Sequence, residues 1–187
     1  MRIALALLIA LAMTGCGTIP LPELQDIDIP VVLPPQGEQP DAGGWATESE
    51  RVRFDPSRLG AVEMQTLGIV AQPGRNADGG WEYMILTLHG DGFDRVLLFQ
   101  VGGGRKAIRF KVGTQPAQNN VCSDNLPDAH TWRVEWGDGS MRVLLDGRQV
   151  GHDEDFNGAP SSAIFGGYDD SRRDFKGSWR NGKVVTQ

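Results

Sequence analysis

Three observations predict an all-β protein built as a sandwich of two antiparallel sheets. The 187 residues include 25 glycines and 11 prolines, a content typical of a chain with many turns. From Trp45 onward, short apolar runs alternate with turn signals, and none of them has the length or the 3.6-residue period of a helix. About ten such runs follow one another, and an array of short strands favours a sandwich or a barrel.

Residues 1–15 predict a secretory signal peptide. Arg2 gives a positive start, and residues 3–13 form an apolar run of Leu, Ile, Ala and Met, which small residues separate from Cys16. This order is typical of a signal peptide, and the run is too short for a membrane-spanning helix, which needs about 20 apolar residues. Residues 13–16, Met-Thr-Gly-Cys, resemble the bacterial lipobox. This resemblance implies that Cys16 becomes the N-terminus and carries acyl chains such as palmitate.

Residues 16–44 predict a lipidated N-terminus followed by a proline-rich tether. Six of the 11 prolines lie here, and proline fixes φ and removes a backbone donor, so this stretch cannot join a helix or a central strand. Gly17 is not the Asp that the lipoprotein resemblance links to inner-membrane retention, which implies an outer-membrane destination in the cell envelope. A linker of no specific length, or one whose apolar patches pack on the domain, remains an alternative.

The domain predicted for residues 45–187 has its clearest strand signals in a three-strand meander. Trp132, Val134 and Trp136 share one face of a strand, which favours the core for at least one of the two indoles. Turns at 137–140 and at Asp146-Gly147 each contain an Asp-Gly pair, a strong hairpin signal. The run 81–88 is apolar on both faces, as expected for a central strand packed from two sides. The remaining predicted strands cover residues 51–54, 61–71, 95–101, 106–112, 163–168 and 175–185.

The meander and the last predicted strands resemble a known superfamily. Residues 130–136, His-Thr-Trp-Arg-Val-Glu-Trp, and 141–147, Met-Arg-Val-Leu-Leu-Asp-Gly, resemble the penultimate strands of concanavalin A-like and laminin G-like jelly rolls. Residues 164–167, Ile-Phe-Gly-Gly, and 175–179, Phe-Lys-Gly-Ser-Trp, resemble the closing strands of laminin G-like domains. The resemblance implies a jelly-roll sandwich with lectin-like binding of a glycan or an envelope protein.

The catalytic motifs of this superfamily are missing from the sequence. Its glucanases carry Glu-x-Asp-x-x-Glu on one strand, which places two glutamates on one face for retaining hydrolysis. Glu135 has no such carboxylate partner on its face, and the Arg, Gln-x-His and Tyr motifs of the lyase branch are missing as well. We therefore expect a non-catalytic binding protein. A divergent polysaccharide-active enzyme and a purely structural envelope lipoprotein are the alternatives.

Aromatic residues and loop acids are the candidate ligand residues. Trp81 opens a strand, and Tyr168 and Trp179 flank a loop, so these three rings are expected to be accessible for stacking on a sugar. Calcium prefers carboxylate and carbonyl oxygens from flexible loops, and superfamily members often hold one near the rim of the sandwich. The candidate calcium ligands are Asp153, Asp155, Asp169 and Asp170.

Charge and cysteine content exclude several classes of function. A net charge of −6 argues against non-specific binding of nucleic acid and against electrostatic docking to anionic lipid. Membrane attachment is therefore expected to depend on the acyl chains. With two cysteines and three histidines, a structural cysteine-rich zinc site is excluded. Cys122 is predicted to be a buried or half-buried thiol, and a Cys16–Cys122 disulfide in an uncleaved export product is the alternative.

Overall fold

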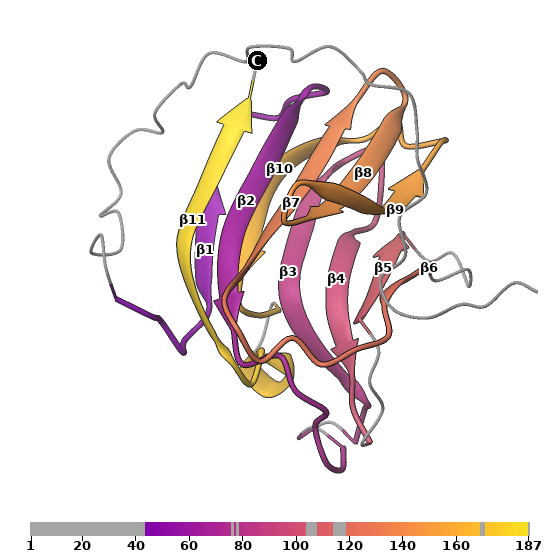
Figure 1. Ribbon diagram of the computed structural model, residues 1–187. Coiled ribbons are helices and arrows are strands. Elements are labelled where there is room, and N and C mark those ends of the chain that lie inside the picture. Colours follow the sequence, from indigo (N-terminus) through magenta and orange to yellow (C-terminus); the bar gives the residue numbers. More distant parts are fainter. Residues whose placement is uncertain are drawn as a thin grey trace, which may run out of the picture.

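The computed structural model describes residues 44–75, 77, 79–103, 108–113, 119–168 and 171–186. These residues form a sandwich of two antiparallel sheets, so the prediction of an all-β jelly-roll fold is confirmed (Figure 1). A single 3₁₀ turn, η1 (Ser171–Arg173), precedes the last strand, and the described ranges contain no α-helix. In this part of the chain, no helix is long and apolar enough to span a membrane.

The two sheets have six and five strands, and the five-stranded sheet lies in front in Figure 1. The six-stranded sheet has the order β1 (Glu50–Arg53), β10 (Ala159–Phe165), β3 (Glu82–Asp91), β4 (Val96–Val101), β5 (Ile108–Val112) and β6 (Asn119–Cys122). The five-stranded sheet has the order β11 (Ser178–Thr186), β2 (Gly60–Leu67), β7 (His130–Gly137), β8 (Ser140–Leu145) and β9 (Arg148–Asp153). All neighbouring strands in both sheets are antiparallel.

The core lies between the sheets and contains the face predicted for the meander strand. Trp132, Val134 and Trp136 are all buried there. The indole N–H of Trp132 donates to Thr66 Oγ1 at 2.9 Å, and that of Trp136 donates to the carbonyl of Ser57 at 2.9 Å. Each ring therefore buries its apolar surface while its polar atom keeps a hydrogen-bond partner, the usual condition for a buried tryptophan.

Both predicted Asp-Gly hairpins are confirmed. Asp138 and Gly139 have φ angles of 50° and 77°, and Asp146 and Gly147 have φ angles of 50° and 78°. Positive φ at both central residues defines the type I′ turn, whose twist matches that of the flanking strands. These turns set the register of β7, β8 and β9, in which Trp132 lies opposite Leu145.

Two strand boundaries differ from the prediction. The strand predicted to run to Ala71 ends at Leu67, because Gly68 adopts a φ of 80° that breaks the pleat. Ile69 then pairs with Leu126 through hydrogen bonds of 3.0 and 2.7 Å. The short edge strand β6 was not predicted, because its Asn-Asn start is typical of a turn.

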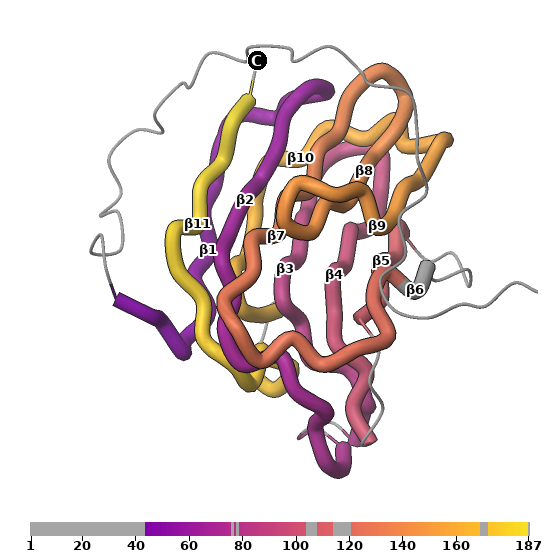
Figure 2. The backbone as a smooth tube through the Cα atoms, viewed as in Figure 1, coloured from indigo at the N-terminus to yellow at the C-terminus, as the bar shows by residue number. Residues whose placement is uncertain are grey.

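Cys122, at the end of β6, is a buried free thiol, as predicted. Cys16 lies outside the described residues, and so do the signal peptide and residues 16–43 of the tether. The last strand runs beside β2, with Thr186 opposite Gly60, so the end of the described chain lies beside the β1–β2 turn (Figure 2).

Candidate ligand-binding surface

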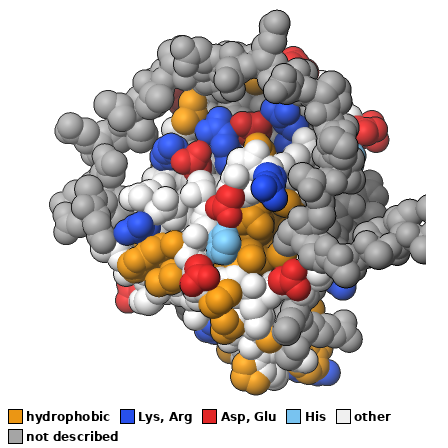
Figure 3. Space-filling model, viewed as in Figure 1, with side chains coloured by type: hydrophobic (Ala, Val, Ile, Leu, Met, Phe, Trp, Pro, Cys, Tyr) orange, Lys and Arg blue, Asp and Glu red, His pale blue; other side chains and the backbone are white. Residues whose placement is uncertain are grey.

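The outer face of the five-stranded sheet carries a network of ion pairs. Arg133 lies at its centre, with Nη1 3.3 Å from Glu63 and Nε 2.6 Å from Glu135. Lys183 contacts the second oxygen of Glu63 at 2.7 Å, and Arg142 contacts the second oxygen of Glu135 at 2.6 Å. Acidic and basic side chains are intermixed on this face (Figure 3). The charges therefore cancel locally, and both oxygens of Glu135 are held by guanidinium groups.

The pKa of Arg133 reflects this arrangement. Burial works against the charged guanidinium, but the hydrogen bonds and negative charges of Glu135 and Glu63 outweigh that effect and raise the pKa of Arg133 above its ordinary value. The network thus fixes the charge state of its central residue, and we assign it a structural role on this face.

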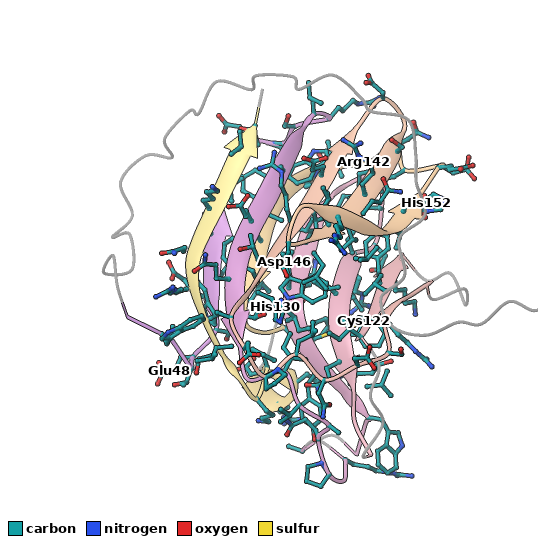
Figure 4. The ribbon with its side chains drawn as sticks, viewed as in Figure 1. Glu48, Cys122, His130, Arg142, Asp146 and His152 are labelled. Atoms are coloured by element: carbon teal, nitrogen blue, oxygen red, sulfur yellow. The ribbon has the colours of Figure 1, made fainter. Side chains whose placement is uncertain are left out.

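His130 and Asp146 form a second polar contact on the five-stranded sheet (Figure 4). The His130 Nδ1 lies 2.6 Å from Asp146 Oδ2, and the backbone N–H of Thr131 donates to Asp146 Oδ1 at 2.8 Å. Partial burial of the carboxyl opposes ionisation, but these hydrogen bonds outweigh it, and the pKa of Asp146 is lower than usual. This contact links the start of β7 to the β8–β9 turn.

One row of directly paired residues crosses the outer face of the six-stranded sheet. Cross-strand partners share a face, so this row follows from the register of five strands. In order from β1 to β5, it contains Arg51, Ile164, Thr87, Leu97 and Lys111. The three central residues are buried, whereas cationic side chains lie at both ends. Four strand spacings separate the two ends, a distance of about 19 Å.

A second cation flanks each end of this row. Side chains two residues apart on a strand share a face, so Arg53 lies beside Arg51 on β1, and Arg109 lies beside Lys111 on β5. We call these four residues the basic flanks. Among the described residues, neither Arg53 nor Lys111 forms an ion pair. The outer face of this sheet therefore differs in charge balance from that of the five-stranded sheet.

The segment between β10 and β11 covers the centre of this outer face. Thr87 Oγ1 donates to the carbonyl of Gly167 at 2.8 Å, and Asp174 forms a parallel bridge with Met84. This cover explains why β3 is buried on both faces, which confirms the prediction for a central strand. Tyr168 packs on a small buried cluster formed by Met84, Leu97, Phe99 and Val101.

Tyr168, a predicted stacking residue, is half-buried and has cationic partners. The guanidinium of Arg95 lies 5.5 Å from the centroid of its ring, and that of Arg173 lies 5.4 Å away. Arg95 precedes β4 and Arg173 belongs to η1, so the ring brings together cations from distant parts of the chain. Tyr168 thus positions two guanidinium groups between the basic flanks.

Trp81, the second predicted stacking residue, is exposed, as expected. Its side chain is 42% exposed at the start of β3. The guanidinium of Arg75 lies 4.8 Å from the ring centroid, and a Cβ atom at Gly103 would come within 2.6 Å of the indole. The ring is therefore packed along one edge by Gly103 and retains a large accessible surface.

Trp179, the third predicted stacking residue, is buried, so the expectation that it is accessible is wrong. It is 2% exposed and lies opposite Thr66, whose side chain also points into the core. Its ring stacks on Phe165 and its N–H donates to the carbonyl of Glu48 at 2.8 Å. A ring in this position cannot present a face to a sugar.

The predicted calcium ligands form no complete site in the described ranges, where no group of three or more Asp, Glu, His or Cys side chains is placed to hold a metal ion. Asp153 Oδ1 accepts a hydrogen bond from the Asp155 backbone N–H at 3.0 Å, which closes a turn within their own loop. Calcium takes about six to eight oxygen ligands, so these two residues alone do not fit it. Asp169 and Asp170 lie outside the described residues, and calcium binding stays a prediction.

The basic flanks are the feature that sequence reasoning missed. Their signal is present in the sequence, because Arg51-Val52-Arg53 and Arg109-Phe110-Lys111 share one pattern. A cation at each end of an apolar residue predicts a strand with two cations on its outer face. What the pattern does not contain is the register that places both strands in one sheet.

No family model and no curated protein matches this sequence. Among solved structures, the chain is similar to the alginate lyase AlyA1 of Zobellia galactanivorans, with a TM-score of 0.51 and 14% identity over 75% of this chain and 65% of the lyase. It is similar to a Trypanosoma rangeli sialidase, with a TM-score of 0.50 and 13% identity over 68% of this chain and 20% of the sialidase. The sandwich is a concanavalin A-like jelly roll.

This jelly roll spans less than two thirds of the lyase and one fifth of the sialidase. It is also similar to a galectin from the sponge Cinachyrella, with a TM-score of 0.48 and 11% identity over 74% of this chain and 99% of the galectin. At these identities the similarity establishes the fold, which is the fold that the sequence resemblance implied.

Proposed function

We propose that this protein is a lipoprotein of the bacterial cell envelope, anchored in the outer membrane through Cys16, whose jelly roll binds a glycan without catalysis. The exposed ring of Trp81 is the observation that carries the binding proposal. Aromatic rings of this kind bury apolar area and retain a polar edge, which suits them to amphipathic ligands.

The setting of Trp81 supports this role. The other described tryptophans of the strand interiors, Trp132, Trp136 and Trp179, are buried and hydrogen-bonded in the core. Trp81 instead lies at the end of β3, next to Glu82, which shares the outer face of the six-stranded sheet through its pairing with Val101. A ligand on that face thus reaches the indole at one end of β3.

The binding proposal is tested with the full chain in detergent on an array of neutral and charged glycans. We expect at least one glycan to bind, and Trp81→Ala to weaken that binding about tenfold, because loss of a contact aromatic costs at least 1 to 2 kcal/mol. Leu59→Ala is the matched control, since Leu59 is a similarly exposed apolar residue, at 37%, in the β1–β2 turn.

Three outcomes would overturn the binding proposal. Loss of binding in Leu59→Ala to the same extent as in Trp81→Ala would remove the role of the indole. Release of shortened sugar products would indicate the enzyme alternative. Failure of every glycan, together with co-purification of an envelope protein, would indicate the structural alternative.

The anchor is tested separately by metabolic labelling with a palmitate analogue in a bacterial host. We expect the chain to incorporate label and to fractionate with membranes, and Cys16→Ser to abolish both. Cys122→Ser is the matched control, because Cys122 is a buried thiol within the sandwich. Labelling that persists in Cys16→Ser would contradict the anchor.

A further inference from the structure

We propose that the outer face of the six-stranded sheet selects anionic glycans, namely polysaccharides that carry carboxylate or sulfate groups. This inference rests on the proposed glycan binding and specifies its ligand. Trp81 supplies a contact that neutral and charged sugars share, whereas the basic flanks distinguish between them. The argument depends on where the cations lie, because the chain as a whole is acidic.

The acidity of the chain is concentrated outside the sandwich. Residues 17–43 contain five of the 24 acidic residues and no Lys or Arg, and Arg2 is the only base before residue 44. The remaining 19 acids and 17 bases therefore leave residues 44–187 with a net charge of only −2. A nearly balanced domain can have a basic face if its acids gather elsewhere.

The two outer faces divide the charges unequally. On the five-stranded sheet, each carboxylate of the Arg133 network contacts two cationic groups. On the six-stranded sheet, all four basic-flank residues point outward, while the outward acids of β3, Glu82 and Asp91, lie at opposite ends of that strand. The middle of the face is therefore bordered by cations on both sides.

The spacing of the flanks suits a polymer rather than a small anion. Arg51 and Lys111 lie at the two ends of one row, about 19 Å apart across four strand spacings. No single carboxylate or sulfate reaches both ends. Between them, Tyr168 holds the guanidinium groups of Arg95 and Arg173. A chain with anionic groups at intervals can contact a flank, the central pair and the other flank.

The side-chain chemistry favours carboxylate and sulfate groups. The planar guanidinium group offers paired donors that match two oxygens of such an anion. Arg53 and Lys111 form no ion pair among the described residues, so a ligand anion there replaces no internal partner. Thr87 and Ser162, which lie in the same outer rows, are buried, so the ligand contacts are expected at the flanks and around Tyr168.

Matched polymers test the inference directly. Dextran and dextran sulfate share one backbone and differ in charge, and polygalacturonate and its methyl ester differ in the same way. With the full chain, we expect the charged member of at least one pair to bind at least about tenfold more tightly, and added salt to weaken that binding because it screens the exposed cations.

Two double variants assign the effect to the basic flanks. We expect Arg53→Ala with Lys111→Ala to weaken binding of the charged polymer about fivefold or more and to leave the neutral polymer unchanged. Arg148→Ala with Lys183→Ala is the matched control, because it removes two exposed cations from the five-stranded sheet. Trp81→Ala is expected to weaken both polymers. Near-ultraviolet circular dichroism checks that each variant is folded.

Each remaining outcome overturns a defined part. Equal binding of charged and neutral polymers, or equal losses in the two double variants, overturns the selection for anions and leaves glycan binding in place. Absence of binding to every polymer overturns both proposals. Double-stranded DNA or anionic lipid vesicles that bind as tightly through Arg53 and Lys111 would replace the anionic glycan by a general polyanion. The salt dependence of the unmodified chain is decisive even if a variant fails to fold.

Discussion

Trp179 of β11 stacks on Phe165 of β10, with ring centroids 5.5 Å apart and an interplanar angle of 22°. The two rings belong to different sheets, so this contact joins the sheets through their interior. The Trp179 N–H donates to the carbonyl of Glu48, just before β1, and adds the start of the domain to the same contact. One indole thus connects the closing strand, the opposite sheet and the segment that enters the sandwich.

Replacement of Trp179 by alanine is predicted to be strongly destabilising. Truncation of a buried Trp to Ala typically costs about 3 to 5 kcal/mol, because apolar burial is lost and a cavity remains. Trp179→Phe keeps the ring contact with Phe165 but loses the hydrogen bond to Glu48, so we expect a smaller loss. Urea unfolding monitored by circular dichroism measures both. Trp81→Ala, at an exposed site, is the control, and an equal loss in that variant would contradict the assigned burial.

Gly166 is predicted to be required beside Trp179. It has a φ of 70°, and a Cβ atom there would lie 2.5 Å from the indole. Gly147 has a similar φ of 78° but open space around its Cβ position. We expect Gly147→Ala to cost about 1 to 2 kcal/mol through backbone conformation alone, and Gly166→Ala to cost distinctly more because Trp179 must also move.

The comparison of these two glycine variants isolates the steric term. Thermal and urea unfolding measure it, and near-ultraviolet circular dichroism reports whether the indole environment changes in Gly166→Ala. Equal costs for the two variants would mean that Trp179 yields freely, and would contradict the tight packing between Gly166 and the ring.

The hydroxyl of Thr66 is predicted to stabilise the core through Trp132. Thr66 is fully buried, and its Oγ1 accepts the indole N–H at 2.9 Å. Thr66→Val keeps the shape but leaves that donor unsatisfied, which costs about 1 to 3 kcal/mol. Thr66→Ser retains the acceptor and loses only a methyl group, so we expect a smaller cost in urea unfolding. A larger cost for Ser than for Val would show that methyl packing dominates.

Local patterns predicted the fold well where chemistry and position coincide. Asp146-Gly147 requires positive φ wherever it occurs, and alternation alone placed Trp132 and Trp136 on one face. Trp179 was misplaced because a single aromatic next to a loop carries no periodic signal. Its direction is set by the pairing of β11 with β2, which places it opposite Thr66.

The candidate surface depends still more on long-range register. Arg53 and Lys111 lie far apart in the sequence, and only the order β1-β10-β3-β4-β5 places them on one face. The same holds for Tyr168, whose partners Arg95 and Arg173 come from two different segments. The cations are visible in the sequence as two matching patterns, but their alignment is a property of the closed sandwich.

The stability of the protein is predicted to depend on pH through Asp146. In the folded state its carboxylate accepts hydrogen bonds from His130 and from the Thr131 N–H, and its pKa lies below the ordinary value. A lowered pKa means that the unfolded state binds protons more tightly, so the stabilising contribution is complete above about pH 4 to 5 and is lost as the pH falls through the folded pKa.

Asp146→Asn tests this contribution because asparagine retains the acceptor for Thr131 and tolerates the positive φ of the turn. We expect the free energy of unfolding to fall less steeply with decreasing pH below about pH 5 in the variant than in the unmodified chain. Urea unfolding at a series of pH values measures the slope, which separates the charge effect from any constant change in turn stability. His152→Gln is a control at an exposed histidine on β9 (Figure 4). Identical slopes for Asp146→Asn and the unmodified chain would mean that the His130–Asp146 contact does not persist in solution.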